Sequence, residues 1–450
     1  MQTNFSPAQL ADPDIAAADK ILQTCVHYGF CTNTCPTYVL TRDENDSPRG
    51  RIDLIRAMLE RGAPEAKTVH HLDRCLSCLS CMTTCAAKVD YVHLIDRARV
   101  HIERHYRRPW ADRYVRHLLA KVLTDPKLFL LALYAGRIAK PLVRLLPQRL
   151  AVLLDMIPER PRPNILTPRV FAAEGRMRKR VALLAGCAQQ ALDGAINAAT
   201  VRLLTRHGCE VVIADGAGCC GSLTLHMGRE LDARASAIAN VRAWSRELEG
   251  RGLDAIVVNA SGCGTTVKDY GHLLARDPAW AEPARRVAGL ARDISEVLSD
   301  IGLQAPLISA AYRIAYHDPC SMQHVQHVTS QPRELLRAAG FHLLEVPEKH
   351  FCCGSAGTYN LLQPDMAAAL GRRKAGHIGS TDPDIIATGN IGCMMQLGRY
   401  CRVPIVHMVE LLDWATGGPR PPALDGVVLR EPHSAAVIQA TDGGNGVGIW

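Results

Sequence analysis

The run CLSCLSCMTTC, residues 75–85, constrains the fold of this chain more strongly than any other feature. Its four cysteines are separated by two, two and three residues, so successive thiolates can turn toward one point while backbone N–H groups face the sulfur atoms of a cluster. Soft thiolate donors select iron–sulfur clusters or zinc over harder ions. Zinc sites seldom use four cysteines from one such run, so we expect an iron–sulfur cluster, with zinc as the alternative.

A second cysteine run, CVHYGFCTNTCP at residues 25–36, lacks one thiol. Tyr28 stands where the second cysteine of such a run belongs. In two-cluster ferredoxins the fourth cysteine of each run ligates the cluster of the other run. This exchange predicts one 4Fe-4S cluster held by Cys35, Cys75, Cys78 and Cys81. It leaves a second site with Cys25, Cys31 and Cys85, and with Tyr28 as a variant ligand.

The site that contains Tyr28 has three alternative states. The cluster can lose one iron and persist as 3Fe-4S, it can keep four irons through an oxygen ligand such as the Tyr28 phenolate or water, or the site can be empty. In the first two cases we expect the reduction potential to differ from that of the neighbouring cluster, because ligand type and net charge set the potential.

The segment DSPRGRIDLIRAMLERG, residues 46–62, joins the two cysteine runs and is predicted to be helical. Ser47 can cap the helix, Pro48 suits its first turn, and Gly62 can end it. Two cysteine runs with a helical connection predict a helical, two-cluster ferredoxin-like domain over residues 1–108.

The second half of the chain repeats itself. VALLAGC ends at residue 187 and RIAYHDPC at residue 320, and each is followed by CCGS, at 219–222 and 352–355. Both matches are 133 residues apart, and a third pair of cysteines, at 263 and 393, is 130 apart. We therefore expect two duplicated α/β cysteine-rich domains, at residues 178–303 and 304–415. Their cysteines follow apolar strands, which is where open α/β sheets place their sites.

Each repeat offers four thiols that could hold a further cluster. The sets are Cys187, Cys219, Cys220 and Cys263 in the first repeat, and Cys320, Cys352, Cys353 and Cys393 in the second. The alternative is that they are buried structural thiols, because free cysteine is among the most buried residue types. Cys209 and Cys401 have no match in the other repeat and are interpreted as core thiols. His317 and His407 lie near strand ends, and a structural role is favoured over contact with a quinone or a proton.

Residues 109–177 are predicted to form a basic helical linker, and residues 416–450 a flexible tail. From 110 to 170 the chain carries 11 Lys and Arg against 4 Asp and Glu. This stretch can pack on the protein's own domains or on a partner subunit, or it can lie on an anionic membrane surface. The chain starts without a signal-like segment and has no apolar run near the roughly 20 residues of a spanning helix. Seventeen cysteines, many in C-x2-C spacing, favour metal ligation over disulfides, so we expect a cytoplasmic location.

Several blocks together resemble the iron–sulfur subunits of glycolate oxidase, also called glycolate dehydrogenase. They are CVHYGFCTNTCPTY, DSPRGRIDLIR, HLDRCLSCLSCMTTC, VDYVHLID and FCCGSAGTYNLLQPDMA, and the likeness runs from residue 20 to about 413. The duplicated half resembles the CCG domains of heterodisulfide reductase and of anaerobic glycerol-3-phosphate dehydrogenase subunits. The overall fold class expected is therefore α+β and multi-domain.

The resemblance implies an electron-transfer subunit that is not catalytic alone. It would take electrons from flavin-containing partner subunits as glycolate becomes glyoxylate and pass them toward membrane quinone, in the cytoplasm or peripherally on the inner face of the cell membrane. The chain has no flavin or nicotinamide fingerprint of its own, and nucleic acid is not expected as a partner.

The sequence departs from the family pattern at four positions. Tyr28 replaces a cysteine, Ala86 replaces the proline after the second run, and Thr266 and Gln396 stand where heterodisulfide reductase repeats have a fifth cysteine. The last two argue against a heterodisulfide-reductase-like enzyme. The sequence also allows an iron–sulfur subunit of another 2-hydroxy-acid or glycerol-3-phosphate dehydrogenase, or a zinc-bound scaffold.

Overall fold

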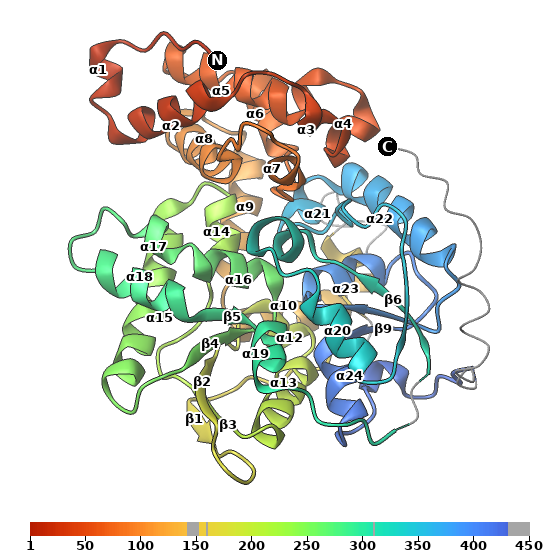
Figure 1. Ribbon diagram of the computed structural model, residues 1–450. Coiled ribbons are helices and arrows are strands. Elements are labelled where there is room, and N and C mark those ends of the chain that lie inside the picture. Colours follow the sequence, from red (N-terminus) through yellow and green to blue (C-terminus); the bar gives the residue numbers. More distant parts are fainter. Residues whose placement is uncertain (142–152, 159–160, 309–310, 431–450) are drawn as a thin grey trace.

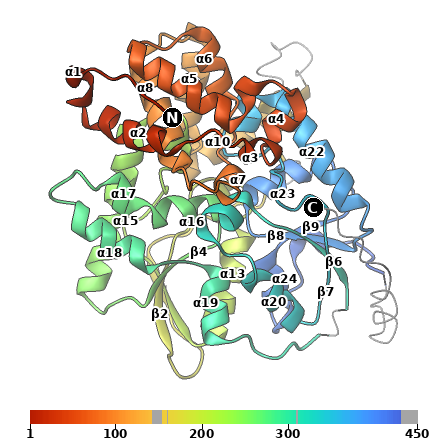
Figure 2. The same ribbon diagram turned by 45° about the horizontal axis from the view of Figure 1, so that its top comes forward.

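A helical N-terminal domain lies across one end of two α/β units in the computed structural model, which describes residues 1–141, 153–158, 161–308 and 311–430 (Figure 1). The turned view shows the same domain covering both units (Figure 2). Hydrogen bonds join the N-terminal domain to both units. Thr83 bonds His324 of the second unit at 3.1 Å, and His93 bonds Asp269 of the first unit at 3.1 Å. The expected α+β, multi-domain class is confirmed.

The N-terminal domain consists of short helices arranged around the two cysteine runs. Its elements are α1 (Pro7–Leu10), α2 (Pro13–Thr24), α3 (Phe30–Asn33), α4 (Pro36–Thr41), η1 (Glu44–Asp46), α5 (Pro48–Arg61), α6 (Ala66–Asp73), α7 (Ser80–Thr83) and α8 (Tyr91–His105). The predicted connecting helix is α5. The Ser47 side chain accepts from Gly50 N–H at its start, and Gly62 ends it in the left-handed region with φ 79°.

The first α/β unit is built on a five-stranded sheet. Its strands are β1 (Arg169–Phe171), β2 (Lys179–Leu183), β3 (Cys209–Ile213), β4 (Ala255–Val258) and β5 (Ala291–Asp293), in the order β1-β3-β2-β4-β5 with only β1 antiparallel. Its helices are α12 (Ala188–Leu192), α13 (Ala195–Arg206), α14 (Ser222–His226), α15 (Glu230–Glu249), α16 (Ser261–Lys268), α17 (Tyr270–Leu273), α18 (Ala281–Leu290) and α19 (Ile294–Ile301).

The second unit repeats this arrangement. Its strands are β6 (Arg313–His317), β7 (His342–Leu344), β8 (Ile385–Thr388) and β9 (Ile405–His407), all parallel, in the order β7-β6-β8-β9. That order matches β3-β2-β4-β5, so the duplication seen in the sequence is a duplication of fold. Its helices are the π-helix η3 (Met322–Gln326), α20 (Gln331–Ala338), α21 (Tyr359–Leu362), α22 (Pro364–Gly379), α23 (Ile391–Leu397), α24 (Met408–Ala415) and the 3-10 turn η4 (Pro422–Leu424).

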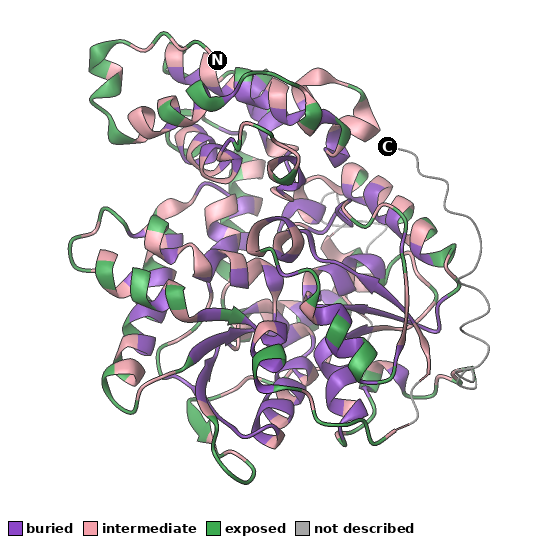
Figure 3. Ribbon diagram, in the orientation of Figure 1, coloured by how far each residue is buried: buried purple, intermediate pink, exposed green. Residues whose placement is uncertain are grey.

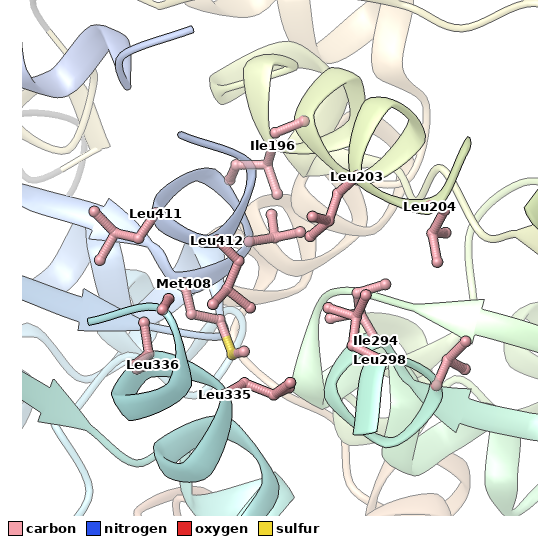
Figure 4. Packing of buried hydrophobic residues seen from close by; sticks show 14 of the residues in the cluster. Ile196, Leu203, Leu204, Ile294, Leu298, Leu335, Leu336, Met408, Leu411 and Leu412 are labelled. Atoms are coloured by element: carbon pink, nitrogen blue, oxygen red, sulfur yellow. The ribbon is translucent and has the colours of Figure 1, made fainter. Parts of the chain in front are cut away.

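Apolar runs such as VALL and AIVV become strands because both faces of each parallel sheet are covered by helices, as the buried colouring of the strands shows (Figure 3). The two units share one core between α13, α19, α20 and α24. Leu203, Leu298, Leu336 and Leu412 meet there from four different helices (Figure 4). The units are therefore packed together as one body through helices and not through their sheets.

Two predicted segments differ from the structure. Within residues 109–177 the structure has helices α9 (Trp110–Val122) and α10 (Pro126–Ala139), but residues 169–171 form β1 at the edge of the first sheet, so that unit begins before residue 178. In the predicted tail, Leu424 is fully buried in the core shared by the units. Residues 431–450 of the tail lie outside the described part, as do 142–152 and 159–160 of the linker.

Within the described residues, no helix combines the length and apolarity needed to span a bilayer.

Candidate metal centres

The two cysteine runs of the N-terminal domain fold in the same way. In the second run, Ser77 and Leu79 flank Cys78 in the left-handed region, with φ 49° and 61°. In the first run, His27 and Gly29 flank the position of Tyr28 with φ 57° and 82°. Each loop leads into a one-turn helix, α7 or α3. The backbone that a cluster requires is therefore kept around Tyr28, although the thiol is missing.

The first predicted ligand set is brought together in the structure. Burial raises the pKa of Cys78 well above its ordinary value, and the neighbouring thiols of Cys320 and Cys35 raise it further. Burial does the same to Cys81, followed by the effect of Cys78 and Cys75. Thiols crowded in this way can be deprotonated together only if a cation neutralises them, so this soft donor set fits an iron–sulfur cluster.

Two buried side chains point hydrogen-bond donors at this first set. Arg51, which is 1% exposed, lies with its guanidinium 3.8 Å from Cys35 Sγ and donates to the His71 carbonyl at 2.8 Å. Tyr91 Oη lies 3.6 Å from Cys75 Sγ. A buried cation and a phenol beside the sulfur atoms would stabilise negative charge on a bound cluster.

The second predicted set surrounds a small cavity that is lined by Cys25, Cys31 and Cys85 together with Tyr28 and Cys81. Burial, and then the thiols of Cys25 and Cys85, raise the pKa of Cys31 to about 11. The Val89 N–H donates to Cys85 Sγ at 3.5 Å. Tyr28 is 65% exposed, so one side of this site faces solvent. Three thiols and a phenol at one cavity fit either a 3Fe-4S cluster or an oxygen-ligated 4Fe-4S cluster.

Ala86, the other departure in this domain, changes only the backbone after its run. Pro36 starts helix α4 directly after Cys35, whereas Ala86 and Ala87 form a turn after Cys85.

In the first α/β unit the four predicted thiols form a connected group. Cys219 interacts with both Cys187 and Cys220, and Cys220 also interacts with Cys263. Hydrogen bonds from the thiols of Cys187 and Cys220 lower the pKa of Cys219 well below its ordinary value. The second unit has the same connections, from Cys320 through Cys352 and Cys353 to Cys393. All 17 cysteines are free.

The glycine of each CCG motif is required by the backbone. Gly221 and Gly354 have φ 86° and 88°, and a Cβ there would lie 2.9 Å from the Ala233 carbonyl oxygen or 2.6 Å from that of Ala367. Each glycine donates its N–H to the first cysteine of its pair, Cys219 or Cys352, at 3.4 Å. The motif therefore turns two adjacent thiols inward and supplies one N–H donor to sulfur.

A cavity of about 600 Å³ lies where both units and the N-terminal domain meet. Thiols from both repeats line it, as does Cys78. Its other wall is apolar and comes from α9 and α10, including Leu119, Val122, Phe129 and Leu133. The thiol group of the second unit is also the one next to the N-terminal domain, since Cys320 and Cys352 both lie near Cys78. Sequence reasoning gave no sign of this cavity, because its lining comes from segments spread along the chain from Leu76 to Met395.

The remaining positions that the sequence singled out have packing roles. Thr266 Oγ1 bonds the Gly262 carbonyl of its own helix, and Gln396 bonds Ala367 and Asn360. Burial raises the pKa of both Cys209 and Cys401 to about 11, and both pack against apolar core residues.

The two histidines near strand ends differ from each other. His407 is held from both sides, because Nδ1 accepts from Val409 N–H and Nε2 bonds the Asn259 carbonyl at 2.9 Å. His317 lies beside Cys353 and Cys393, with ligand atoms of all three within 4.8 Å of one another. Burial lowers the pKa of His317 to about 3, with a further contribution from Lys374. The sequence favoured a structural role for both; only its position three residues before Cys320 could have distinguished His317.

Comparisons with known proteins agree with this geometry. Residues 24–89 match the 4Fe-4S dicluster domain, and residues 181–268 and 314–398 match the cysteine-rich CCG domain. The chain is 39% identical over 417 residues to the glycolate oxidase iron-sulfur subunit of Escherichia coli K12, covering 92% of this chain and 99% of that protein. It is 31% identical over 427 residues to the probable glycolate oxidase iron-sulfur subunit of Bacillus subtilis, covering 88% and 94%.

More distant matches cover less or show only the fold. Lactate utilization protein A of Oceanobacillus iheyensis is 28% identical over 242 residues, covering 52% of this chain and 96% of that protein. A crystal structure of a hypothetical protein from Helicobacter pylori superposes with a TM-score of 0.51 at 10% identity, covering 91% of this chain and 73% of that one. With its paired cysteine runs, its duplicated CCG units and its likeness to the E. coli and B. subtilis proteins along nearly their whole length, the chain belongs to the family of glycolate oxidase iron–sulfur subunits.

Proposed function

We propose that this chain carries electrons from a flavin-bearing partner that oxidises glycolate to glyoxylate, and delivers them to membrane quinone. Clusters bound at its thiol groups would supply one-electron carriers. The chain itself contributes the ligands, the donors around their sulfur atoms and the spacing between the groups. Flavin-containing glycolate dehydrogenase subunits are the partners that this role requires.

The observation that supports this role is the serial arrangement of the thiol groups. Cys81 lines the cavity of the Cys25 group and also lies against Cys78. Cys78 in turn lies near Cys320, and the group of Cys320 opens on the large cavity together with that of the first unit. The thiol groups therefore form a connected path from the exposed Tyr28 face to the cavity beneath α9 and α10.

The apolar cavity supports a quinone as the acceptor. Leu131 and Ile138 of α10 are 66% and 81% exposed, and Trp110 and Tyr114 of α9 are also exposed. Basic residues accompany this apolar face in the same segment. Such a pair of helices can lie on an anionic bilayer and place the cavity within reach of a lipid-soluble acceptor.

The membrane part of the proposal is tested with vesicles. The full chain is sedimented with vesicles of anionic or of neutral lipid, and a Leu131→Asp/Ile138→Asp variant is compared with Leu231→Asp/Leu307→Asp, which alters exposed leucines elsewhere. Binding to anionic vesicles only, lost in the first variant and kept in the second, is expected. Equal sedimentation of both variants would contradict the membrane contact.

The electron-transfer role is tested by anaerobic reconstitution. Glycolate is added to the chain together with flavin-bearing subunits, and cluster reduction is followed by electron paramagnetic resonance. Reduction is expected only when the flavin partner is present. Parallel reactions contain lactate or glycerol 3-phosphate as competing substrates in place of glycolate. Glycolate oxidation by the isolated, flavin-free chain, or faster reduction with either competing substrate, would overturn the assignment.

The state of the Tyr28 site is tested by Tyr28→Cys. Since the left-handed residues on both sides of Tyr28 match those around Cys78, a cysteine there can reach the cluster without backbone change. We expect conversion to an ordinary 4Fe-4S cluster, seen as a gain of iron and loss of the 3Fe-4S or oxygen-ligated signal. Tyr106→Cys, a change at the C-terminal end of α8 in the same domain, is the control and leaves the spectrum unaltered. An identical spectrum in the Tyr28 variant would show that no cluster lies beside it.

A further inference from the structure

We propose that the second CCG unit holds a metal atom through a mixed ligand set, in which a ring nitrogen of His317 joins the thiolates of Cys353 and Cys393. The first unit holds its centre through thiolates alone. The two repeats, which have the same cysteine pattern, are therefore chemically different sites. This inference stands on the second unit and does not depend on glycolate being the substrate.

The distances among the three side chains suit one shared metal atom. Their ligand atoms all lie within 4.8 Å of one another, and all three residues are buried. Around a tetrahedral ion with metal–sulfur bonds of about 2.3 Å and metal–nitrogen bonds of about 2.0 Å, ligand atoms are about 3.5 to 4 Å apart. Small side-chain movements would therefore close the set. The contact of Cys353 with Cys352 places a further thiolate next to it.

The imidazole of His317 has one ring nitrogen that no described residue bonds. That nitrogen, Nε2, is buried. Thr388, its register partner on β8, likewise has a buried hydroxyl without a partner in the described part of the chain. Buried polar atoms are rarely left unsatisfied in native proteins, and a bound metal would satisfy the ring nitrogen. By contrast, both nitrogens of the equally buried His407 are bonded to protein.

The first unit has no nitrogen ligand at the corresponding place. The offset of 133 residues pairs His317 with Leu184, which is buried and packs in one apolar cluster with Cys220. A second difference lies on the helix after the CCG motif. Lys374 of α22 is buried near Cys320 and bonds the Glu348 carbonyl, whereas α15 carries Asn240, which bonds Cys219 and Gly218.

These differences change the charge in and around the two centres. Replacing a thiolate by a neutral imidazole makes a centre less negative, and a buried ammonium group stabilises added electrons further. An iron centre in the second unit should therefore accept an electron more readily than one in the first, whereas a zinc ion would accept none. Imidazole and thiolate together suit iron within a cluster as well as zinc, so the metal must be identified by the experiment.

The test uses the full chain, prepared anaerobically with 15N-labelled or unlabelled histidine. Wild type is compared with His317→Leu, which copies Leu184, with His317→Cys, and with His342→Leu as the control. His342 pairs with Arg313 at the opposite end of β6 from His317. Metal and sulfide are counted per chain. Pulsed electron paramagnetic resonance reports nitrogen coupled to iron, and zinc X-ray absorption reports nitrogen bound to zinc.

We expect a histidine nitrogen signal in wild type and in His342→Leu that disappears in His317→Leu. His317→Cys should keep the metal with sulfur in place of nitrogen. A nitrogen signal in pulsed electron paramagnetic resonance identifies an iron centre, and a nitrogen signal in zinc X-ray absorption identifies a zinc site. Either result supports the ligand assignment. Unchanged nitrogen coupling in His317→Leu would overturn the ligand assignment. It would also be overturned if the second unit of the wild type binds no metal, which a metal count left unchanged by Cys393→Ser would show. Unfolding curves that match wild type show that a variant is folded.

Discussion

The two CCG units have the same strand order and the same cysteine positions, yet they differ in what stands behind the cysteines. The second unit has His317 and Lys374 beside its thiols, and the first has Leu184 and Asn240. The second unit places Cys320 and Cys352 next to Cys78. Duplication thus repeats the cysteines and the turn that presents them, while the surrounding side chains and the docking of the N-terminal domain make the two thiol groups unequal.

The largest expected effect is a difference between the two units in their contribution to electron transfer. Cys320→Ser removes a second-unit thiol that lies near Cys78, so quinone reduction by the reconstituted complex should fall about 100-fold, equivalent to about 2.7 kcal/mol in the barrier. Cys187→Ser, the matched change in the first unit, should leave reduction of the second unit intact. Stopped-flow spectra follow cluster reduction in each of the two variants. Equal losses in both variants would mean that the units are equivalent in the path.

One buried ion pair of the second unit has no counterpart at the same position of the first unit. Arg333 binds Asp318 at 2.7 Å, and both side chains are buried, whereas the first unit has Ala185 at the position of Asp318. Arg333→Met would leave the carboxylate buried without its partner and cost about 3 to 5 kcal/mol of unfolding free energy. Denaturant titration measures this. The double variant Arg333→Met/Asp318→Ala removes both charges and places at 318 the alanine that the first unit has at 185, so it should recover most of the loss; no recovery would contradict the ion-pair explanation.

A third change tests how the units are held together. Arg202 and Arg206 on α13 of the first unit both bind Asp413 on α24 of the second, and Asp413 is fully buried. Asp413→Asn should cost about 2 kcal/mol, because hydrogen bonds to charged groups are replaced by weaker ones and both arginines can turn to solvent. We expect the unfolding transition to broaden or split as the units separate. A sharp transition at the wild-type midpoint would show that the apolar core alone joins them.

The last expected effect is a dependence of stability on pH that comes from Glu410 of the second unit. Helices α19 and α24 start with matching capping boxes, Asp293 with Glu296 and His407 with Glu410. Glu296 binds Lys268, whereas Glu410 is buried, and burial followed by the nearby Asp193 raises the pKa of Glu410 to about 8.

Because the folded protein then binds a proton that the unfolded chain releases above its ordinary pKa of 4.5, stability should fall as pH rises from about 4.5 to 8 and level off above that. The slope from this one group is at most about 1.4 kcal/mol per pH unit. Glu410→Gln should flatten it, measured as unfolding free energy against pH, and Glu296→Gln is the control. A Gln variant with the wild-type slope would show that Glu410 is not the group responsible.

Local spacing was sufficient to predict much of this protein. The run from Cys75 to Cys85 predicted a cluster loop, the segment from Ser47 to Gly62 predicted helix α5, and the repeated cysteines predicted the second sheet from the first. These features depend on residues that are close in sequence or on the comparison of one repeat with the other. Strand β1 and the burial of Leu424 were missed, because each depends on pairing or packing with a distant segment.

What the sequence by itself determined is the cysteine runs, their repetition and the turns that present the thiols, since these follow from spacing and backbone preferences over a few residues. The tertiary structure alone decided which thiol groups face one another, that α9 and α10 close an apolar cavity over them, and that His317 is left beside Cys353 and Cys393 without a protein partner among the described residues. The physical reason is that burial and electrostatic contact arise between segments brought together only by folding, so no pattern along the chain records them.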